Sequence, residues 1–251
     1  MSEEMESELV RERTGAEEGQ IIMPFYLICD VSSSMTGDMS TLNEGIRRLR
    51  RAIVAQPQVD DVAQIGIITF STDAQVVLPL SQMSEEQMPT LHARGSTNYG
   101  SAFRLLAQTI QRDIAQLKAQ QLKVYRPCAF FLTDGQPTDS SWLQTFTSSL
   151  TYDKARGTGM KGHPLFIPFG FRSASEDVLN KLAYPPDKGK WFHAKTHNIE
   201  EALNGILNVI MNSVISSGLS VPAGAPTTAV QAPSPSSGIA SGASQYDSQW
   251  V

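Results

Sequence analysis

The run Phe25-Tyr26-Leu27-Ile28-Cys29-Asp30-Val31-Ser32-Ser33-Ser34-Met35 decides the fold, because an apolar segment ends abruptly in an aspartate and two alternating serines. An apolar run of this length, bounded by polar turn residues, predicts a strand that is buried on both faces. The carboxyl end of such a strand is where open α/β sheets bind their ligands. Asp30, Ser32 and Ser34 place three hard oxygen donors there, which suits a hard divalent cation such as Mg²⁺.

Strand and helix patterns alternate through the rest of the chain. Leu42, Ile46, Leu49 and Ile53 recur at helical spacing between positions 38 and 56. The β-rich runs 62–70 and 74–80 are separated by a short polar turn and predict a hairpin. Further strands are predicted at 128–134, 164–169 and 191–194, and further helices after residue 98 and at 142–150, 175–184 and 199–214. We therefore predict an α/β fold: a Rossmann-like, doubly wound, mostly parallel sheet with one antiparallel edge strand and helices on both faces.

The composition predicts one domain with two tails. The chain has 251 residues, of which 41% are hydrophobic, enough for one sizeable core. Residues 1–20 hold seven Glu and two Arg and are predicted to be a disordered acidic arm. Residues 21–217 form the predicted domain. Residues 218–251 are rich in Ser, Ala, Gly and Pro and are predicted to be a flexible tail.

Several classes of protein are disfavoured by the charge and apolar patterns. The formal charge of −5 resides in the first 20 residues, so the remainder is neutral and offers no basic footprint for nucleic acid. The N-terminus has no apolar h-region, and no segment approaches 18 consecutive apolar residues. We therefore expect no signal peptide, no membrane span and a cytoplasmic location. Cys29 and Cys128 fall in apolar runs and are predicted to be buried, reduced thiols.

Two further residues extend the motif at Asp30. Asp134 ends the second buried strand, and Thr97 lies in the loop between the two strands. The set Asp30-Val31-Ser32-Ser33-Ser34, Thr97 and Asp134 resembles the metal-ion-dependent adhesion site of von Willebrand factor A domains, which is written D-x-S-x-S, then a distant Thr, then a distant Asp. The resemblance covers residues 22–217. It implies that the serines and the threonine bind a metal directly or nearly so, with at least one aspartate acting through water. The threonine of this family usually follows two glycines, whereas here Gly95-Ser96 precedes it.

Within that family the chain is most similar to the TerY-like proteins of bacterial tellurium-resistance and stress clusters. The shared features are the run Leu132-Thr133-Asp134-Gly135-Gln136-Pro137-Thr138-Asp139 and the hairpin of residues 67–80. This resemblance implies partners in the same cluster, namely a metal-dependent protein phosphatase and a serine/threonine kinase. It also implies a role as an adaptor in a tellurite or stress response.

The electrostatics of the motif point to a partner of defined chemistry. Two carboxylates at the ends of adjacent strands repel each other, and a bound cation relieves that repulsion. The remaining donors are neutral hydroxyls, so Mg²⁺, or Mn²⁺ as an alternative, keeps much of its positive charge and an open position. We expect an acidic side chain of a protein partner to fill that position. Met35, Tyr99 and Gln136 are candidates for the rim of the contact surface, although Met35 and Tyr99 could instead pack under the loops.

Other interpretations use the same residues. A lone D-x-S-x-S run could be a strand followed by a helix cap, and Thr97 could cap the helix after it. Asp139 is interpreted as part of a turn that caps the helix near Trp142, or as a residue behind the ligands. A metal-dependent phosphohydrolase with Asp30 as nucleophile is the alternative function, but such enzymes usually need a second acid where this chain has Ser32. A scaffold subunit with a vestigial metal site is a third hypothesis.

Overall fold

One mixed sheet organises the part of the chain that the computed structural model describes, residues 19–196, 198–233 and 238–244. Its strand order is β10-β9-β8-β5-β1-β2-β3, and β4 also pairs with β1. The bounds are β1 Ile21–Asp30, β2 Ala63–Phe70, β3 Ala74–Gln82, β4 Lys123–Val124, β5 Cys128–Thr133, β8 Leu165–Gly170, β9 Lys190–Ala194 and β10 Ile239–Ala243. Strands β9, β8, β5, β1 and β2 are parallel, whereas β3 and β10 run antiparallel at the two edges.

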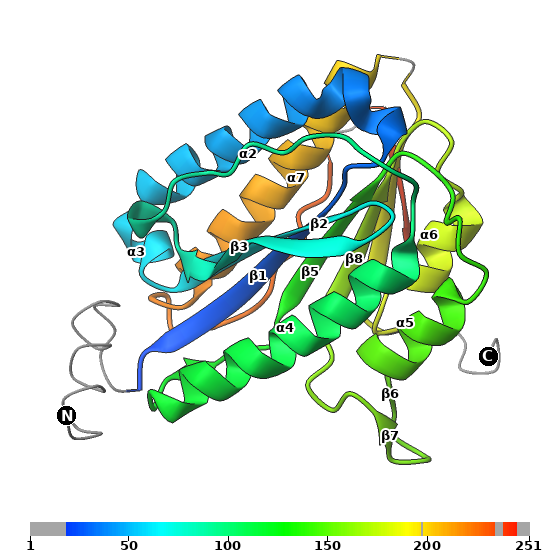
Figure 1. The fold of residues 1–251 in the computed structure, drawn as a ribbon. Coiled ribbons are helices and arrows are strands. Elements are labelled where there is room, and N and C mark those ends of the chain that lie inside the picture. The colour runs from blue at the N-terminus through cyan, green and yellow to red at the C-terminus, as the bar shows by residue number, and fades with distance from the viewer. Residues whose placement is uncertain (1–18, 197, 234–237, 245–251) are drawn as a thin grey trace, which may run out of the picture.

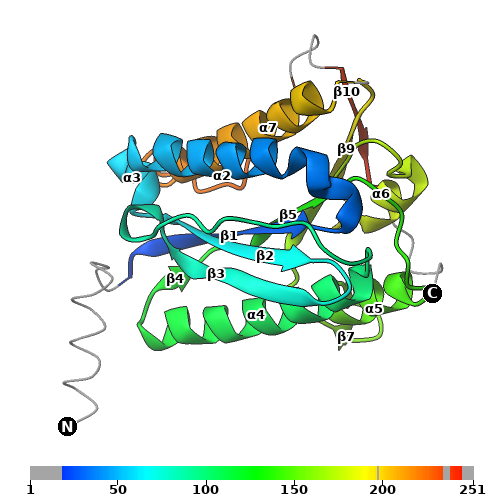
Figure 2. The ribbon, with the colours of Figure 1, turned by 45° about the horizontal axis from the view of Figure 1, so that its top comes forward.

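Helices cover both faces of this sheet (Figures 1 and 2). One face carries α2 and α7, with the short α3 beside them, and the other carries α4 and α5. The helix α6 packs near β8 and β9. The bounds are α2 Met39–Val54, α3 Pro57–Asp60, α4 Tyr99–Ala119, α5 Trp142–Leu150, α6 Glu176–Leu182 and α7 Ile199–Ser220, with 3₁₀ turns η1 Ser33–Asp38 and η2 Met83–Glu85. A small hairpin of β6 (Tyr152–Asp153) and β7 (Thr158–Gly159) lies outside the main sheet.

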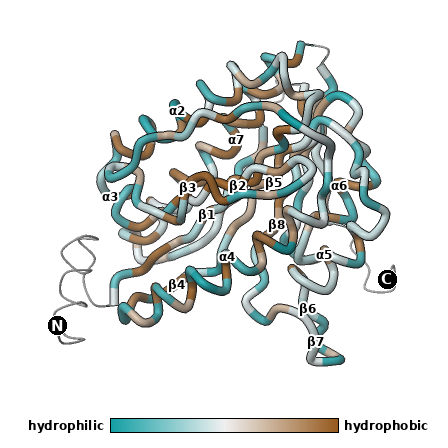
Figure 3. Tube along the Cα trace, viewed as in Figure 1, coloured by the Kyte–Doolittle hydropathy of each residue, from teal (hydrophilic) through white to brown (hydrophobic). Residues whose placement is uncertain are grey.

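The strand β1 occupies the middle of the sheet. This central position buries both of its faces and explains why its sequence is an apolar run. Leu27 lies opposite Ile67 of β2 on one side and Phe130 of β5 on the other. Because successive side chains of a strand alternate between faces, Leu27 packs towards α2 and α7, and Tyr26 and Ile28 pack towards α4. Figure 3 shows apolar residues along the central strands and polar residues on the outer turns of the helices. The carboxyl ends of β1, β5 and β8 meet at one edge, at the upper right of Figure 1.

The predicted fold class is confirmed. The sheet is mostly parallel, the hairpin of β2 and β3 provides the predicted antiparallel edge, and helices lie on both faces. Cys29 and Cys128 are free and fully buried, as predicted. Of the predicted acidic arm, residues 1–18 lie outside the described residues.

The segment after α7 differs from the predicted flexible tail. Residues 239–243 form β10, a second antiparallel edge strand that pairs with β9. Before it, the side-chain hydroxyls of Ser213 and Ser217 on α7 each accept a hydrogen bond of 2.9 Å, from the amides of Gln231 and Ala229 respectively. The open edge of β9 and the serines of α7 thus satisfy the backbone of a segment that has few apolar side chains of its own. Its composition does not reveal these partners. Residues 234–237 and 245–251 of this tail lie outside the described residues.

The closing helix α7 is long and apolar enough to cross a bilayer by length and composition, with 22 residues and a hydropathy of 1.3. However, 56% of its most apolar stretch is buried inside the protein. Its apolar residues, among them Leu203, Ile206 and Ile210, belong to the same core as β1 and α2. These are the contacts of a core helix.

Candidate metal centre

The structure brings the strand-end residues of β1 and β5 together, although 100 positions separate them in the sequence. Ser34 Oγ donates a 2.9 Å hydrogen bond to Asp134 Oδ1. The hydroxyls of Ser32 and Ser34 lie 3.0 Å apart, and the Ser32 amide donates to Asp30 Oδ1 at 2.8 Å. Asp30, Ser32 and Asp134 are each at most 2% exposed. Four of the five predicted ligands are therefore joined by hydrogen bonds, three of them buried and Ser34 exposed at the surface.

Asp30 is held in place by donors on both of its oxygens. Besides the Ser32 amide on Oδ1, Thr133 Oγ1 donates to Oδ2 at 2.8 Å, and Tyr99 Oη donates in turn to Thr133 Oγ1 at 3.0 Å. Burial raises the pKa of the Asp30 carboxyl to about 6, against the lowering effect of the Ser32 and Thr133 hydrogen bonds, and the nearby charge of Asp134 adds to the rise. The protein therefore holds this carboxylate at a cost that a bound cation would offset.

The loop that carries Thr97 is tied to both neighbouring loops. The Gly95 carbonyl accepts 3.0 Å hydrogen bonds from the amide and the hydroxyl of Ser33. The Thr97 carbonyl accepts from the Thr138 amide at 2.8 Å and from the Thr138 hydroxyl at 3.0 Å. Gly95 has a φ of +69°, and a Cβ there would lie 2.5 Å from a Thr72 oxygen, so glycine is required at this turn.

The cap of the following helix is Asn98 and not Thr97. Its side-chain oxygen accepts from the Ser101 amide at 3.0 Å and so satisfies the first turn of α4. Thr97 is 8% exposed, and its hydroxyl makes no hydrogen bond to any part of the chain that the structure describes. That hydroxyl is therefore available to a ligand.

Asp139 has a different partner from the one predicted. Its two carboxylate oxygens accept from the amides of Tyr99 and Gly100, at 2.9 and 3.1 Å, so it holds the start of α4. The helix near Trp142 is preceded by Ser141 instead. Asp139 therefore links the loop after β5 to the loop of Thr97 from behind.

Arg172 and Asp38 belong to the same cluster and were missed by the sequence reasoning. Arg172 Nη1 lies 3.1 Å from Asp134 Oδ2 and 3.1 Å from the Ser34 carbonyl oxygen, and it forms an ion pair with Asp38 Oδ2. Asp38, at the end of η1, is 7% exposed. Burial raises the pKa of its carboxyl, and the Arg172 charge partly offsets that rise. Arg172 follows the carboxyl end of β8, at the same edge of the sheet as Asp30 and Asp134. The rule that ligands bind at the carboxyl ends of parallel strands could therefore have pointed to its position as well.

Two of the three rim candidates do not lie at the rim. Met35 is 1% exposed and Tyr99 is 0% exposed, because both pack beneath the loops. The Tyr99 hydroxyl reaches Thr133 and the Gly135 carbonyl oxygen, and it thereby supports the ligand loops from below. Gln136 is exposed and donates to the Ser173 carbonyl oxygen at 3.3 Å, so it remains a rim candidate.

The residues present fit a hard divalent cation. The donor set is all oxygen, with the carboxylates of Asp30 and Asp134 and three hydroxyls, one of which has no partner. Asp38 Oδ2 adds a buried carboxylate oxygen whose partner is the Arg172 guanidinium, in an ion pair. Within the described ranges no group of three or more His, Cys, Asp or Glu side chains forms a conventional metal cluster. The candidate centre therefore depends on hydroxyls as much as on carboxylates.

Comparison with known proteins agrees with this geometry. Residues 25–136 match the family model described as von Willebrand factor type A domain, and this match includes all five predicted ligands. The fold is that of a von Willebrand factor A domain. No curated protein matches the chain at a significant level.

Several solved structures share this A-domain fold. Proximal thread matrix protein 1 from the mussel byssus is 16% identical, with a TM-score of 0.53 over 80% of this chain and 49% of that one. The pilus adhesin SpaC from Lactobacillus rhamnosus GG, in its open conformation, is 15% identical, with a TM-score of 0.56 over 79% of this chain and 31% of that one. A von Willebrand factor type A protein from Catenulispora acidiphila is 18% identical, with a TM-score of 0.51 over 78% of this chain and 43% of that one. The chain thus spans less than half the length of each of these proteins.

A further structure of the mussel protein is described as having a zinc-occupied metal-ion-dependent adhesion site motif. It is 15% identical to this chain and has a TM-score of 0.51 over 80% of this chain and 49% of that one.

Proposed function

We propose that this chain is a non-enzymatic, cation-dependent protein-binding module. A divalent cation held by Asp30, Ser32, Ser34, Thr97 and Asp134 recruits an acidic side chain of a protein partner. The observation that carries the proposal is the convergence of Ser34 and Asp134 at 2.9 Å, from the ends of two different strands. Because the serine and threonine donors are neutral, they leave much of the charge of the cation for a partner carboxylate to neutralise.

The all-oxygen donor set favours Mg²⁺ or Mn²⁺ as the cation. Zinc in proteins prefers nitrogen and sulfur ligands, whereas hard cations prefer oxygen. The zinc-occupied structure of the mussel protein nevertheless supports a divalent ion in a site of this type. A competition between Mg²⁺, Mn²⁺ and Zn²⁺ for the same site therefore belongs in the first measurements.

The surroundings of Asp30 support binding rather than catalysis. Both of its oxygens accept hydrogen bonds, from the Ser32 amide and the Thr133 hydroxyl, which hold the carboxylate in place as a ligand. Position 32, where such phosphohydrolases usually carry a second acid, is a serine. The proteins of similar fold are described as a byssus matrix protein and a pilus adhesin, which are structural and adhesive roles. Asp30-dependent turnover of a generic phosphoester would overturn this part of the proposal.

The likeness to TerY-like proteins extends the proposal to a cellular setting. In this setting the chain is a cytoplasmic adaptor in a bacterial tellurite or stress response. Its partners are a metal-dependent protein phosphatase and a serine/threonine kinase encoded in the same cluster. The run of residues 132–139 and the hairpin of β2 and β3 support this assignment.

Calorimetric titration of the purified chain with Mn²⁺ tests the metal centre. We expect one ion per chain, and we expect Asp134→Asn and Ser34→Ala each to weaken binding by about a hundredfold, because the first removes the charge of a ligand and the second removes a ligand oxygen. Asp73→Asn is the matched control, since Asp73 is exposed and pairs only with Arg94, at 3.0 Å. Equal affinities of the wild type and Asp134→Asn would contradict the proposed ligand set.

A pull-down from the native lysate tests the protein contact. The wild-type chain should retain its partners in Mg²⁺ and release them in EDTA, and Asp134→Asn should retain none in either buffer. Partners that stay bound in EDTA would show that the contact does not use the cation.

A further inference from the structure

We propose that Arg172 is a built-in competitor of the divalent cation. Its guanidinium bridges Asp134 and Asp38 while no divalent cation is bound, and it leaves Asp134 when the cation enters. Arg172 thereby sets the cation concentration at which the site fills. This inference rests on the proposed metal centre and adds to it a second, internal occupant.

The geometry places the arginine among the ligands. One nitrogen, Arg172 Nη1, contacts three oxygens: Asp134 Oδ2 at 3.1 Å, the Ser34 carbonyl oxygen at 3.1 Å and Asp38 Oδ2 in an ion pair. Asp134 is also a predicted ligand of the divalent cation, whereas the predicted ligand atom of Ser34 is its hydroxyl and not the carbonyl oxygen that Arg172 contacts. The guanidinium therefore already occupies the positive position that the carboxylates define.

A guanidinium compensates the oxygens and charges of this cluster only in part. A terminal guanidinium nitrogen carries two hydrogens and can satisfy at most two of the three surrounding oxygens. Asp38 Oδ2 is buried and meets Arg172 Nη1 as an ion pair, without a hydrogen bond of regular geometry from the described residues. When Asp30, Asp38 and Asp134 are ionised, one arginine leaves two negative charges in the cluster, and a divalent cation would neutralise them.

The backbone holds Arg172 in position for this role. Its φ of 53° is left-handed, a conformation that non-glycine residues adopt only when their surroundings impose it. The next residue imposes it here, because the amide and the hydroxyl of Ser173 donate to the Asp134 carbonyl oxygen at 3.1 and 3.0 Å. The turn after β8 is thus clamped to the end of β5, and the arginine side chain is directed at Asp134.

The side chain also has a route out of the site. The Arg172 side chain is 30% exposed, whereas that of Asp134 is 1% exposed. The guanidinium can therefore move towards solvent while Asp134 stays buried. Its contact with the Asp38 carboxylate lies on the η1 side of the cluster and can be kept when the contact with Asp134 is lost.

Mn²⁺ titration of Arg172→Gln tests the competition. We expect this variant to bind Mn²⁺ about tenfold or more tightly than the wild type, because a charge-assisted hydrogen bond to Asp134 no longer has to be broken. Arg94→Gln is the matched control: it removes an arginine whose partner, Asp73, is exposed, and it should bind as the wild type does. Arg172→Lys keeps the charge but not the forked geometry and should fall between wild type and Arg172→Gln.

A second readout follows the arginine itself. The side-chain Nε–H resonance of Arg172 should shift when Mg²⁺ is added to the wild-type chain, and that of Arg94 should not. Equal or weaker Mn²⁺ binding by Arg172→Gln, or an unshifted Arg172 resonance at saturating Mg²⁺, would overturn the inference and leave the metal centre standing. Absence of Mn²⁺ binding by the wild type and by every variant would overturn both.

Discussion

Two buried aspartates lie beside arginines in this protein, and they differ in how completely their negative charge is compensated. Asp113 on α4 accepts from Arg112 Nε and Nη2 on one oxygen, at 2.9 and 2.8 Å, and from the Tyr26 hydroxyl on the other, at 3.0 Å. Asp134 shares the single guanidinium of Arg172 with Asp38, whose Oδ2 meets it as an ion pair. The first cluster is balanced in charge and the second is not.

This difference separates a carboxylate whose charge is balanced within the fold from one whose charge is not. A buried carboxylate with a full set of donors contributes to a unique core and has no need of a ligand. A cluster of three carboxylates with one arginine costs stability unless something else binds. Burial of a carboxylate alone therefore does not identify a metal ligand, whereas burial without enough compensating positive charge does.

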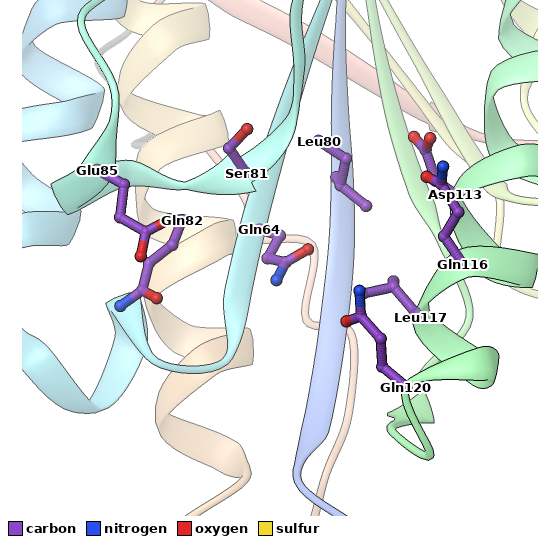
Figure 4. A pocket seen from close by; sticks show the side chains of 9 residues that line it. All are labelled: Gln64, Leu80, Ser81, Gln82, Glu85, Asp113, Gln116, Leu117 and Gln120. Carbon is purple, nitrogen blue, oxygen red and sulfur yellow. The ribbon is translucent and has the colours of Figure 1, made fainter. Parts of the chain in front are cut away.

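The surroundings of Asp113 fit its structural role. It lies at the side of a small cavity of about 180 Å³ between β3 and α4, which is lined mainly by glutamines and leucines (Figure 4). Burial, followed by the charge of Asp113, raises the pKa of the Tyr26 hydroxyl. The hydroxyl therefore stays protonated and keeps donating to Asp113.

The largest expected effect is that of Asp113→Ala on stability. The change leaves the Tyr26 hydroxyl buried without its acceptor and removes the partner of Arg112, and we expect a loss of about 2–4 kcal/mol in the free energy of unfolding. Arg112 is half exposed, so water compensates for part of the broken pair. Urea unfolding in EDTA measures the loss.

The control for this variant is Asp177→Ala, which removes an exposed carboxylate paired with Lys181 at 3.4 Å and should cost less than about 0.5 kcal/mol. The Mn²⁺ affinity of Asp113→Ala should equal that of the wild type. A weakened affinity would show that the Asp113 cluster also shapes the candidate metal centre, so the two aspartates would not have separate roles.

Much of the metal centre could be predicted because it follows from strand periodicity. The apolar run before Asp30 predicts a central strand, and parallel strands end at a common edge, so Asp30 and Asp134 had to lie near each other. The position of Arg172 after β8 follows from the same rule, but its contact with Asp38 could not be found in this way, because that contact depends on how η1 and the turn after β8 pack. Thr97 and Asn98 are adjacent and both can cap a helix, and the structure shows that Asn98 does so.

The edge strand β10 could not be predicted from the sequence either. The strand β10 pairs through its backbone, and its segment has no alternating apolar pattern to announce it. Gly242 is required there, because a Cβ would lie 2.5 Å from the Trp191 ring. Such a glycine reads as a loop residue in the sequence.

An effect of opposite sign is expected for Asp38→Asn. The amide removes one buried negative charge, and Arg172 remains paired with Asp134, so the metal-free protein should gain up to about 1 kcal/mol at neutral pH. Asp60→Asn is the matched control, because Asp60 is buried but accepts from the amides of Met83 and Ser84. It should lose about 1 kcal/mol. A loss of stability in Asp38→Asn as large as that of Asp60→Asn would mean that Asp38 is structural.

His163 offers the smallest effect and extends the comparison to a buried base beside an arginine. Burial, together with the charge of Arg126, lowers the pKa of the His163 imidazole below its usual 6.5. The unfolded chain therefore takes up a proton that the folded protein resists, and stability is lost as the pH falls below 6.5. The loss should be below about 1 kcal/mol between pH 7 and 5.

This loss is measured by urea unfolding, as the difference in pH dependence between the wild type and His163→Gln. The variant His92→Gln, at an exposed histidine, is the control. If both variants follow the pH dependence of the wild type, the imidazole at position 163 is protonated as easily in the fold as in water, and burial beside an arginine does not suffice to keep a base neutral.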